Sequence, residues 1–240
     1  MGKLDTVDSH TQKLDGRLEK GKRAKAAIIA SAVDVFSAKG YDGAQTSEIA
    51  RIAGYAESTV FLHFKNKRGL VLAIMRDYYE DLMNGAKLIL TTTDDAQEQL
   101  IALTRHYLVE LAKGWKVVRL FGNHARYTES ETFDEFTKYN RIYTNLYIDI
   151  FERLKSDKVL RSDIDSRQLR DMLFGAIEHY AIANFRKKRA PDIGKFMDGT
   201  FEILFYGAGN RKPSAQPVSD AENIESKLDS ILALLKSQAK

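Results

Sequence analysis

Apolar residues recur at spacings of three and four along most of this chain, and that spacing is typical of α-helices that bury one face. No stretch shows the sustained alternation of apolar and polar residues that indicates a half-buried strand. The pattern therefore predicts an all-α protein. The expected helices cover residues 21–38, 46–53, 67–90, 115–121, 130–154 and 166–188, with further helices beginning near residues 57, 95 and 191.

A short amphipathic helix is expected directly after the first long one. Thr46 is a candidate N-cap, because its hydroxyl can accept a hydrogen bond from an unpaired amide of the first turn. Ile49, Ile52 and Ala53 follow at helical spacing and are expected to form the apolar face. Gly54 then ends the helix, because glycine enters the left-handed conformation without steric cost.

A second short helix follows the glycine turn. Val60 and Phe64 are expected to point at the first helix of the chain. Ser58 and Thr59 are short hydrogen-bond donors on the other side, and His63 can donate to a phosphate from a ring nitrogen. Helix, glycine turn and helix form the outline of a helix-turn-helix, whose second helix enters the major groove of DNA.

Two charged residues flank this second helix. Glu57 either accepts from a cytosine amino group or stabilises the helix dipole from the first turn, and the dipole interpretation is favoured. Lys67 begins the next helix, where a cation and free amides suit a backbone phosphate. The candidate DNA-binding residues are Thr46, Tyr55, Glu57, Ser58, Thr59, Phe61, His63 and Lys67.

The helix-turn-helix also carries a recognisable set of residues. The set comprises Thr46, Ile49, Ala50, Ala53, Gly54, Thr59, His63, Phe64, Asn66, Lys67, Gly69 and Leu70, preceded by Phe36, Gly40 and Tyr41. With these residues the segment resembles the DNA-binding segment of the TetR family of bacterial transcriptional regulators. The chain has Ala56 where the family usually has Ser or Thr, and Phe61 where it usually has Tyr. Phe61 cannot donate to a phosphate, so one backbone contact is lost.

The distribution of charge agrees with a DNA-binding N-terminal segment. Residues 1–69 hold 12 basic and 8 acidic residues, so they account for the whole net charge of +4. A basic segment suits a polyanion, although a solubilising basic tail is an alternative. The chain has no cysteine, no secretory signal and no apolar run near the roughly 20 residues of a membrane span. We therefore expect a cytoplasmic protein.

Four segments are predicted along the chain. Residues 1–21 form a flexible basic arm, for which plain disorder is the alternative. Residues 22–66 form the helix-turn-helix DNA-binding domain, and residues 67–209 form the helical ligand-binding and dimerisation domain that the family resemblance implies. Residues 210–240 hold a linker and an amphipathic helix, which packs on the body or on a partner subunit unless it is disordered.

The body contains two further sets of candidate residues. An aromatic set suggests an apolar ligand pocket, although ordinary packing explains any single member. These residues are Tyr107, Trp115, Phe121, Tyr143, Tyr147 and Phe174.

The resemblance also implies that the last two body helices pair across a two-fold axis. The alternative is that the candidate interface residues belong to the core of a single chain. The candidates are Ile177, Tyr180, Ala181, Phe185, Phe201 and Phe205. Residues 174–193 resemble a region of TetR regulators that respond to fatty acyl thioesters.

No catalytic residue, metal ligand or cofactor site is predicted. The chain has no phosphate-cradling glycine loop, no His-Glu-x-x-His motif and no nucleophile elbow. The predicted function is that of a ligand-responsive transcriptional regulator, a homodimeric repressor released from a palindromic operator by a small, largely apolar effector. The alternative is a helical adaptor or lipid-pocket protein that acts through its body and C-terminal coiled coil. An enzyme is disfavoured because no nucleophile–base pair is apparent.

Overall fold

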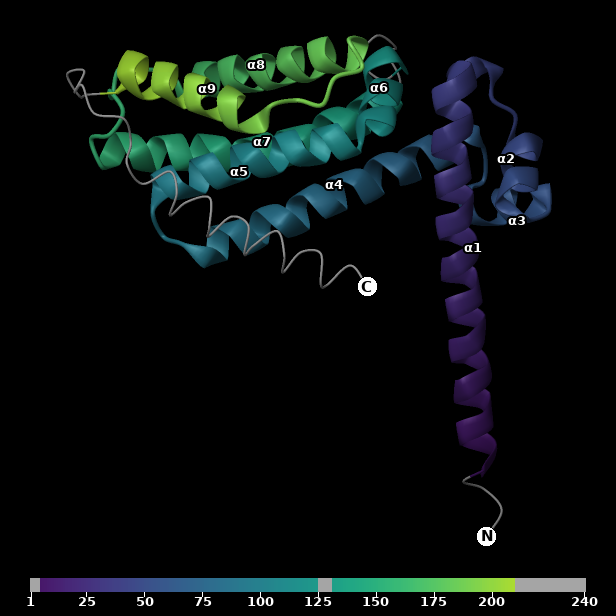
Figure 1. The fold of residues 1–240 in the computed structure, drawn as a ribbon. Coiled ribbons are helices and arrows are strands. Elements are labelled where there is room, and N and C mark those ends of the chain that lie inside the picture. The colour runs from purple at the N-terminus through teal and green to yellow at the C-terminus, as the bar shows by residue number, and fades with distance from the viewer. Residues whose placement is uncertain (1–4, 125–130, 210–240) are drawn as a thin grey trace. The chain divides into compact units, whose positions relative to one another are not determined.

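The structure, a computed structural model, describes residues 5–124 and 131–209, with side chains for residues 16–120 and 134–207. Within these ranges the chain forms helices and no strand, apart from an isolated bridge between Leu160 and Gly209, so the predicted all-α class is confirmed (Figure 1). The helices are α1 Asp5–Gly43, α2 Thr46–Ala53, α3 Glu57–Phe64, α4 Lys67–Thr92, α5 Ala96–Lys113, α6 Trp115–His124, α7 Glu131–Ser156, α8 Ser166–Arg186 and α9 Ile193–Ala208.

The chain divides into two compact units that are discontinuous in sequence. The head unit consists of Met1–Tyr78 and Lys116–Phe136, and the body unit of Tyr79–Trp115 and Thr137–Lys240. Helix α4 therefore contributes its first part to the head unit and its second part to the body unit. The four predicted sequence segments remain predictions.

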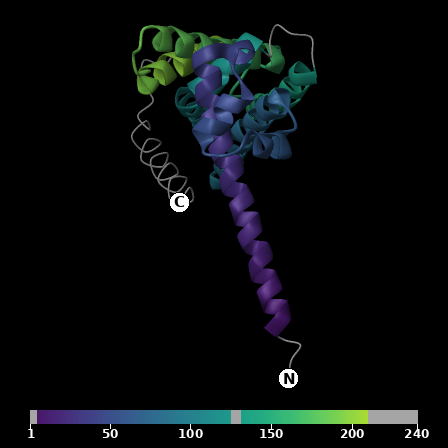
Figure 2. The ribbon, with the colours of Figure 1, turned by 90° about the vertical axis from the view of Figure 1, so that its right-hand side faces the viewer.

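The head unit is built around α1, the long purple helix of Figures 1 and 2. Ile28, Ala32 and Phe36 are buried along one of its faces, as the apolar spacing predicts. The helix was expected to begin near residue 21, but it begins at Asp5. At its other end Gly40 has a φ of 73° and a ψ of 174°, which breaks the regular helix two residues after its predicted end at residue 38.

Helix α2 packs against both α1 and α3. Gly54 ends it in the left-handed conformation with a φ of 77°, as predicted. Ile52 corrects the predicted apolar face, because 49% of its side chain is exposed. The buried side of this eight-residue helix is narrow and contains only Ile49 and Ala50.

The body unit uses aspartate caps to begin its helices. Asp95 accepts hydrogen bonds from the amides of Gln97 and Glu98, both at 2.8 Å, and so begins α5 as predicted. Asp192 accepts from the Lys195 amide at 3.1 Å, so α9 begins after Asp192 and not at Pro191 as predicted. A second correction concerns α6, which continues past Gly122 to His124.

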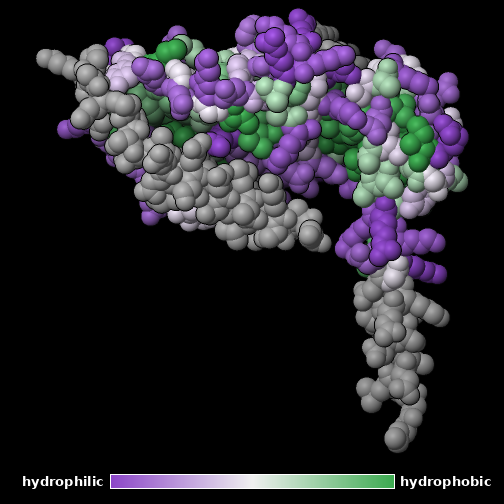
Figure 3. Space-filling model, in the orientation of Figure 1, coloured by the Kyte–Doolittle hydropathy of each residue, from purple (hydrophilic) through white to green (hydrophobic). Residues whose placement is uncertain are grey.

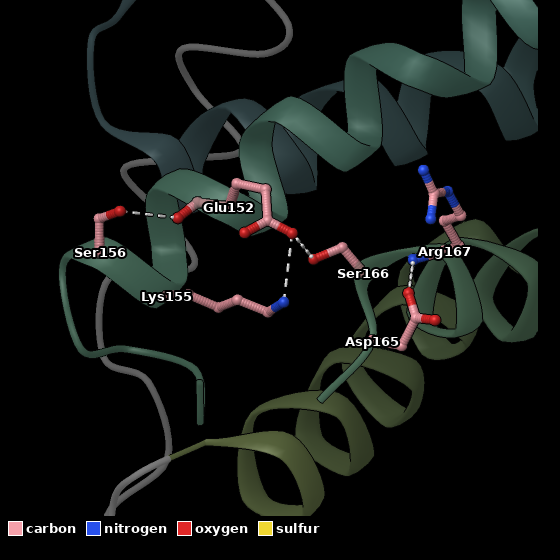
Figure 4. Close-up of polar contacts among 6 residues, drawn as sticks. All are labelled: Glu152, Lys155, Ser156, Asp165, Ser166 and Arg167. Atoms are coloured by element: carbon pink, nitrogen blue, oxygen red, sulfur yellow. Dashed lines mark hydrogen bonds and ion pairs between the residues drawn. The ribbon is translucent and has the colours of Figure 1, made fainter. Parts of the chain in front are cut away.

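The turn between α7 and α8 is held by a small polar network (Figure 4). The Ser166 hydroxyl donates to the Glu152 carboxylate at 2.6 Å, and Lys155 donates to the same oxygen at 3.2 Å. The hydrogen bond from Ser166 is the main cause that lowers the pKa of Glu152. Asp165 caps α8 through the Arg167 amide at 2.8 Å. These contacts hold the start of α8 against the end of α7.

Figures 1 and 2 both show α8 and α9 side by side in the body unit. The Tyr180 and Phe196 rings stack between them with centroids 4.5 Å apart, and the Tyr180 hydroxyl donates to the Asp192 carbonyl.

None of the helices in residues 5–124 and 131–209 combines the length and apolar character needed to cross a bilayer. The predicted C-terminal helix after residue 210 lies outside the described residues.

Candidate nucleic-acid interface and effector pocket

The two sides of α3 differ sharply in exposure. Val60 is fully buried and Phe64 is 5% exposed, so these residues attach α3 to the head as predicted. Ser58 and His63 are exposed, and Thr59 is half-buried. The helix therefore presents a polar side away from the head core. That side has the hydroxyl and imidazole donors expected of a helix that meets phosphates and base edges.

Thr46 and Glu57 are engaged with each other. The Thr46 hydroxyl donates to the Glu57 carboxylate at 2.6 Å, which joins the start of α2 to the first turn of α3. Thr46 is therefore not the N-cap that was predicted; Gln45 occupies the N-cap position and makes no side-chain cap bond. The bond holds the two helices of the motif together, because each partner belongs to a different helix.

Lys67 lies at the start of α4 and makes contacts that were not predicted. Its Nζ donates to the carbonyl oxygens of Tyr41 at 2.8 Å, Asp42 at 3.3 Å and Ala44 at 3.2 Å. It also lies 4.5 Å from the centroid of the Tyr41 ring. The backbone at the end of α1 thus accepts the donors that were assigned to a DNA phosphate. We correct the assignment: Lys67 connects α4 to the end of α1.

The remaining amides at the start of α4 are also partly used. The side chain of Asn66 accepts a hydrogen bond from the Gly69 amide at 2.8 Å. Arg51 and Lys65 are exposed cations next to α3. Two other residues were predicted to contact DNA. Tyr55 is half-buried, and Phe61 is 45% exposed.

Four of the six predicted pocket residues meet in the body unit. Tyr107 of α5, Tyr143 and Tyr147 of α7 and Phe174 of α8 form what we call the aromatic cluster, and each is less than 9% exposed. The Phe174 ring centroid lies 4.9 Å from that of Tyr107 and 4.8 Å from that of Tyr147. Complete burial raises the pKa of Tyr147, so its hydroxyl stays protonated.

The other two predicted pocket residues do not belong to this cluster. Trp115 stacks instead on Phe185, with ring centroids 4.2 Å apart and planes at 12°. Both residues are half-buried, so the assignment of Trp115 to the pocket and of Phe185 to the dimer interface stays a prediction. The side chain of Phe121 lies outside the described residues.

A groove of about 250 Å³ opens between α7 and α8 beside the aromatic cluster. It is lined by Thr137, Asn140, Arg141, Thr144, Arg170, Asp171, Phe174 and Glu178. Phe174 belongs to both the groove and the cluster, so polar and apolar surfaces are continuous there. Apart from Phe174, the groove residues were not identified by the sequence analysis. Their signal is periodic, since Thr137, Arg141 and Thr144 recur at helical spacing, as do Arg170, Phe174 and Glu178.

The predicted dimer residues divide into buried and partly exposed ones. Ile177, Ala181 and Phe201 are at most 7% exposed within a single chain, so they are core residues and not interface residues. Tyr180 and Phe205 are half-buried, and Phe205 stacks on Phe201.

Other residues of the same helices present apolar surface. We call Met172, Ile182, Ile203 and Tyr206 the α8–α9 face; they are 64%, 37%, 75% and 42% exposed respectively.

The α2–turn–α3 geometry, with a buried inner side and a polar outer side, defines a helix-turn-helix DNA-binding protein. Residues 28–74 match the family described as "Bacterial regulatory proteins, tetR family". Residues 28–74 thus form a DNA-binding segment of the TetR family, and the similar proteins are transcriptional regulators and not enzymes. Regulators of this family bind operator DNA and small-molecule ligands and are dimeric.

Similar proteins agree with this assignment. The "Fatty acid metabolism regulator protein" of Bacillus subtilis is 24% identical over 194 residues, which cover 80% of this chain and all of that protein. The "HTH-type transcriptional repressor KstR2" of Rhodococcus jostii is 25% identical over 167 residues, covering 68% of this chain and 81% of the repressor.

A solved structure shares the fold. It is described as the transcriptional regulator FadR from Bacillus subtilis in complex with stearoyl-CoA. Its TM-score is 0.69 at 22% identity, and the match covers 76% of this chain and 98% of that one. This chain is a ligand-responsive, DNA-binding transcriptional regulator, and the adaptor or lipid-pocket alternative is not favoured.

Proposed function

We propose that this protein is a homodimeric cytoplasmic repressor that binds a palindromic operator through α3 and leaves it when a fatty acyl thioester binds the body unit. One observation carries the DNA-binding half. Ser58, Thr59 and His63 lie on a side of α3 away from the buried Val60 and Phe64. In a dimer, two such helices would enter successive major grooves about 34 Å apart.

The charge of the head supports a DNA target. The net charge of +4 resides in residues 1–69, and phosphate neutralisation supplies much of the affinity of such proteins. Ser58, Thr59 and His63 can donate to phosphates or base edges in the major groove. Arg51 and Lys65 are exposed cations at the margins of the same surface.

The effector class is argued from the body unit. The aromatic cluster offers an apolar wall, and the α7–α8 groove beside it is lined by Arg141, Thr137 and Asn140 and also by the acidic Asp171 and Glu178. Such a combination suits an acyl chain joined to a polar, anionic carrier. Arg170 is less available, because it pairs with the adjacent Asp171 at 2.8 Å. The similarity to a regulator solved with stearoyl-CoA supports the same class.

Release from DNA requires that the effector favour one conformation over another. Helix α4 begins in the head unit and continues into the body unit. Helix α6 is tied to α1 inside the head unit, where Lys116 pairs with Asp34 at 2.6 Å and Arg119 donates to the Ser37 carbonyl at 2.5 Å. We propose that α4 and α6 carry the change from the effector to α3.

The first test is binding to the DNA upstream of the protein's own gene, measured by fluorescence anisotropy at several salt concentrations. We expect specific binding that weakens as salt rises. His63→Ala should weaken binding about tenfold, the equivalent of about 1.4 kcal/mol. Thr91→Ala, at an exposed position of the body unit, is the matched control and should bind as the wild type does. Absent or salt-insensitive binding would contradict the DNA-binding half.

The same assay tests the effector half with three additives: stearoyl-CoA, coenzyme A alone and stearate. We expect stearoyl-CoA to release the DNA and the other two to have little effect. Arg141→Gln should raise the stearoyl-CoA concentration needed while leaving DNA affinity unchanged, since Arg141 lines the groove and lies in the body unit. DNA binding that persists unchanged in stearoyl-CoA would reject this effector class and leave the DNA-binding half intact.

A further inference from the structure

Helix α3 presents one large hydrophobic side chain that has no role in the head core. Leu62 is 80% exposed, the highest exposed fraction of any large hydrophobic residue in the described part of the chain. Burying a leucine side chain contributes about 1.5–3 kcal/mol to folding. At 80% exposure Leu62 makes little of this contribution within the chain, so its side chain is accessible for a contact outside it.

The position of Leu62 follows from helix geometry. Successive residues are about 100° apart around an α-helix. Leu62 lies two residues from each of the buried Val60 and Phe64, and is therefore on the opposite side of α3. Ser58 is one turn earlier on this outward side. Leu62 thus occupies the middle of the surface that α3 presents outward, next to the polar groups of Ser58 and Thr59.

The surroundings of Leu62 select the kind of partner. Protein–protein docking sites on monomers are usually contiguous apolar patches of several hundred Å². The neighbours of Leu62 on the outward side are Ser58, Thr59 and His63 together with the 45% exposed Phe61, so the apolar surface is small, and the head has the chain's excess of positive charge. Figure 3 likewise shows hydrophobic surface on the head interspersed with hydrophilic side chains. The partner must therefore combine negative charge with a small apolar group.

Duplex DNA meets both requirements in its major groove. The phosphates supply the charge, and the C5-methyl group of thymine is an apolar group on the base edges of that groove. We propose that Leu62 is a specificity-determining residue that packs against a thymine methyl group in each operator half-site. The proposal rests on the proposed function, because it requires α3 in the major groove. It predicts a thymine at the base pair that lies opposite the middle of α3 in each half-site.

The test removes the methyl group from the DNA and the leucine from the protein separately. In duplexes of the bound upstream fragment, each thymine is replaced in turn by deoxyuridine, which lacks only the C5-methyl group. At one position in each half-site, we expect the wild type to bind about fourfold more weakly, the equivalent of about 0.8 kcal/mol. L62A should bind the thymine duplex more weakly than the wild type and should not distinguish thymine from deoxyuridine there.

The matched control is Ser58→Ala, which alters the same outward side and should retain the discrimination between thymine and deoxyuridine. Truncation of an exposed side chain should leave thermal stability unchanged, and a large loss of stability in L62A would overturn the surface placement. A wild type that is insensitive at every thymine, or an L62A variant that keeps the full sensitivity, would overturn the proposal while DNA binding stands. Failure to bind the upstream fragment at all would overturn the proposed function and this inference together.

Discussion

At the scale of single residues, His106 is a buried titratable group that belongs to neither proposed site. It is 6% exposed in α5, and its Nε2 lies 3.3 Å from the Leu82 carbonyl oxygen. Within the described residues its Nδ1 has no hydrogen-bond partner. Gly85 permits this packing, because a Cβ there would lie 2.3 Å from the His106 ring. Burial is the main cause that lowers the pKa of His106.

The lowered pKa predicts a loss of stability in acid. The unfolded chain, in which histidine has its ordinary pKa of 6.5, takes up the proton at a higher pH than the folded chain does. The stability is therefore complete above this value and falls as the pH drops below it. Chemical denaturation from about pH 8 to about pH 5 should show a steeper loss for the wild type than for His106→Gln. His63→Gln, at an exposed site, is the control, and parallel curves for the wild type and His106→Gln would contradict the prediction.

At the scale of elements, the contact between α4 and the end of α1 decides how the helix-turn-helix is held. Lys67 donates to three carbonyl oxygens around the end of α1 and lies over the Tyr41 ring. The regular helix has already broken at Gly40, and of these three carbonyls that of Tyr41 also accepts from the Ala44 amide at 3.4 Å. Lys67 therefore stabilises the connection that leads from α1 into α2.

Lys67→Gln distinguishes this structural role from a phosphate contact. We expect the variant to lower the free energy of unfolding by about 1–3 kcal/mol, because carbonyl groups lose a charged donor. The dependence of DNA affinity on salt should keep the wild-type slope. Lys65→Gln is the matched comparison, since Lys65 is an exposed cation two residues away. A stable Lys67→Gln protein with a salt slope shallower by about 1.8, that is about 0.9 for each of the two subunits, would restore the original assignment to a phosphate.

The short helices of the head illustrate what local sequence can predict. Gly54 and the Asp95 cap were assigned correctly, because left-handed backbone and N-cap bonds depend on neighbouring residues alone. The Thr46–Glu57 hydrogen bond was missed, because its partners are 11 residues apart and meet only once α2 and α3 have packed. The start of α9 was predicted near Pro191 and lies two residues later at Ile193, because Asp192 caps the helix.

At the scale of the whole molecule, we propose the α8–α9 face as the surface that a second subunit covers. The residues first assigned to that role, Ile177, Ala181 and Phe201, are buried inside one chain. Met172, Ile182, Ile203 and Tyr206 lie on the same two helices and expose their apolar side chains. TetR regulators are dimeric, so a partner is expected for an exposed apolar face of this kind.

Ile203→Glu should convert the protein to monomers, because a charge would be placed at a desolvated interface. Sedimentation velocity would measure the change, and operator affinity should fall because the two recognition helices are no longer linked. Ile142→Glu, at an α7 position that is 47% exposed, is the control and should remain dimeric. A dimeric Ile203→Glu protein with unchanged sedimentation would place the interface elsewhere.

The sequence by itself determined the all-α class, the order of the helices, the glycine turn of the DNA-binding motif and the location of the basic charge. These features depend on residue spacing, backbone freedom and composition, all of which are local. Only the tertiary structure decided which side of a helix remains exposed: Ile177 and Leu62 are both apolar residues on helices, yet one is fully buried and the other 80% exposed. It also decided that Lys67 contacts the end of α1 and that Trp115 packs on Phe185. The physical reason is that helical periodicity states which residues share a side, whereas burial and hydrogen bonding depend on what other segments bring to that side.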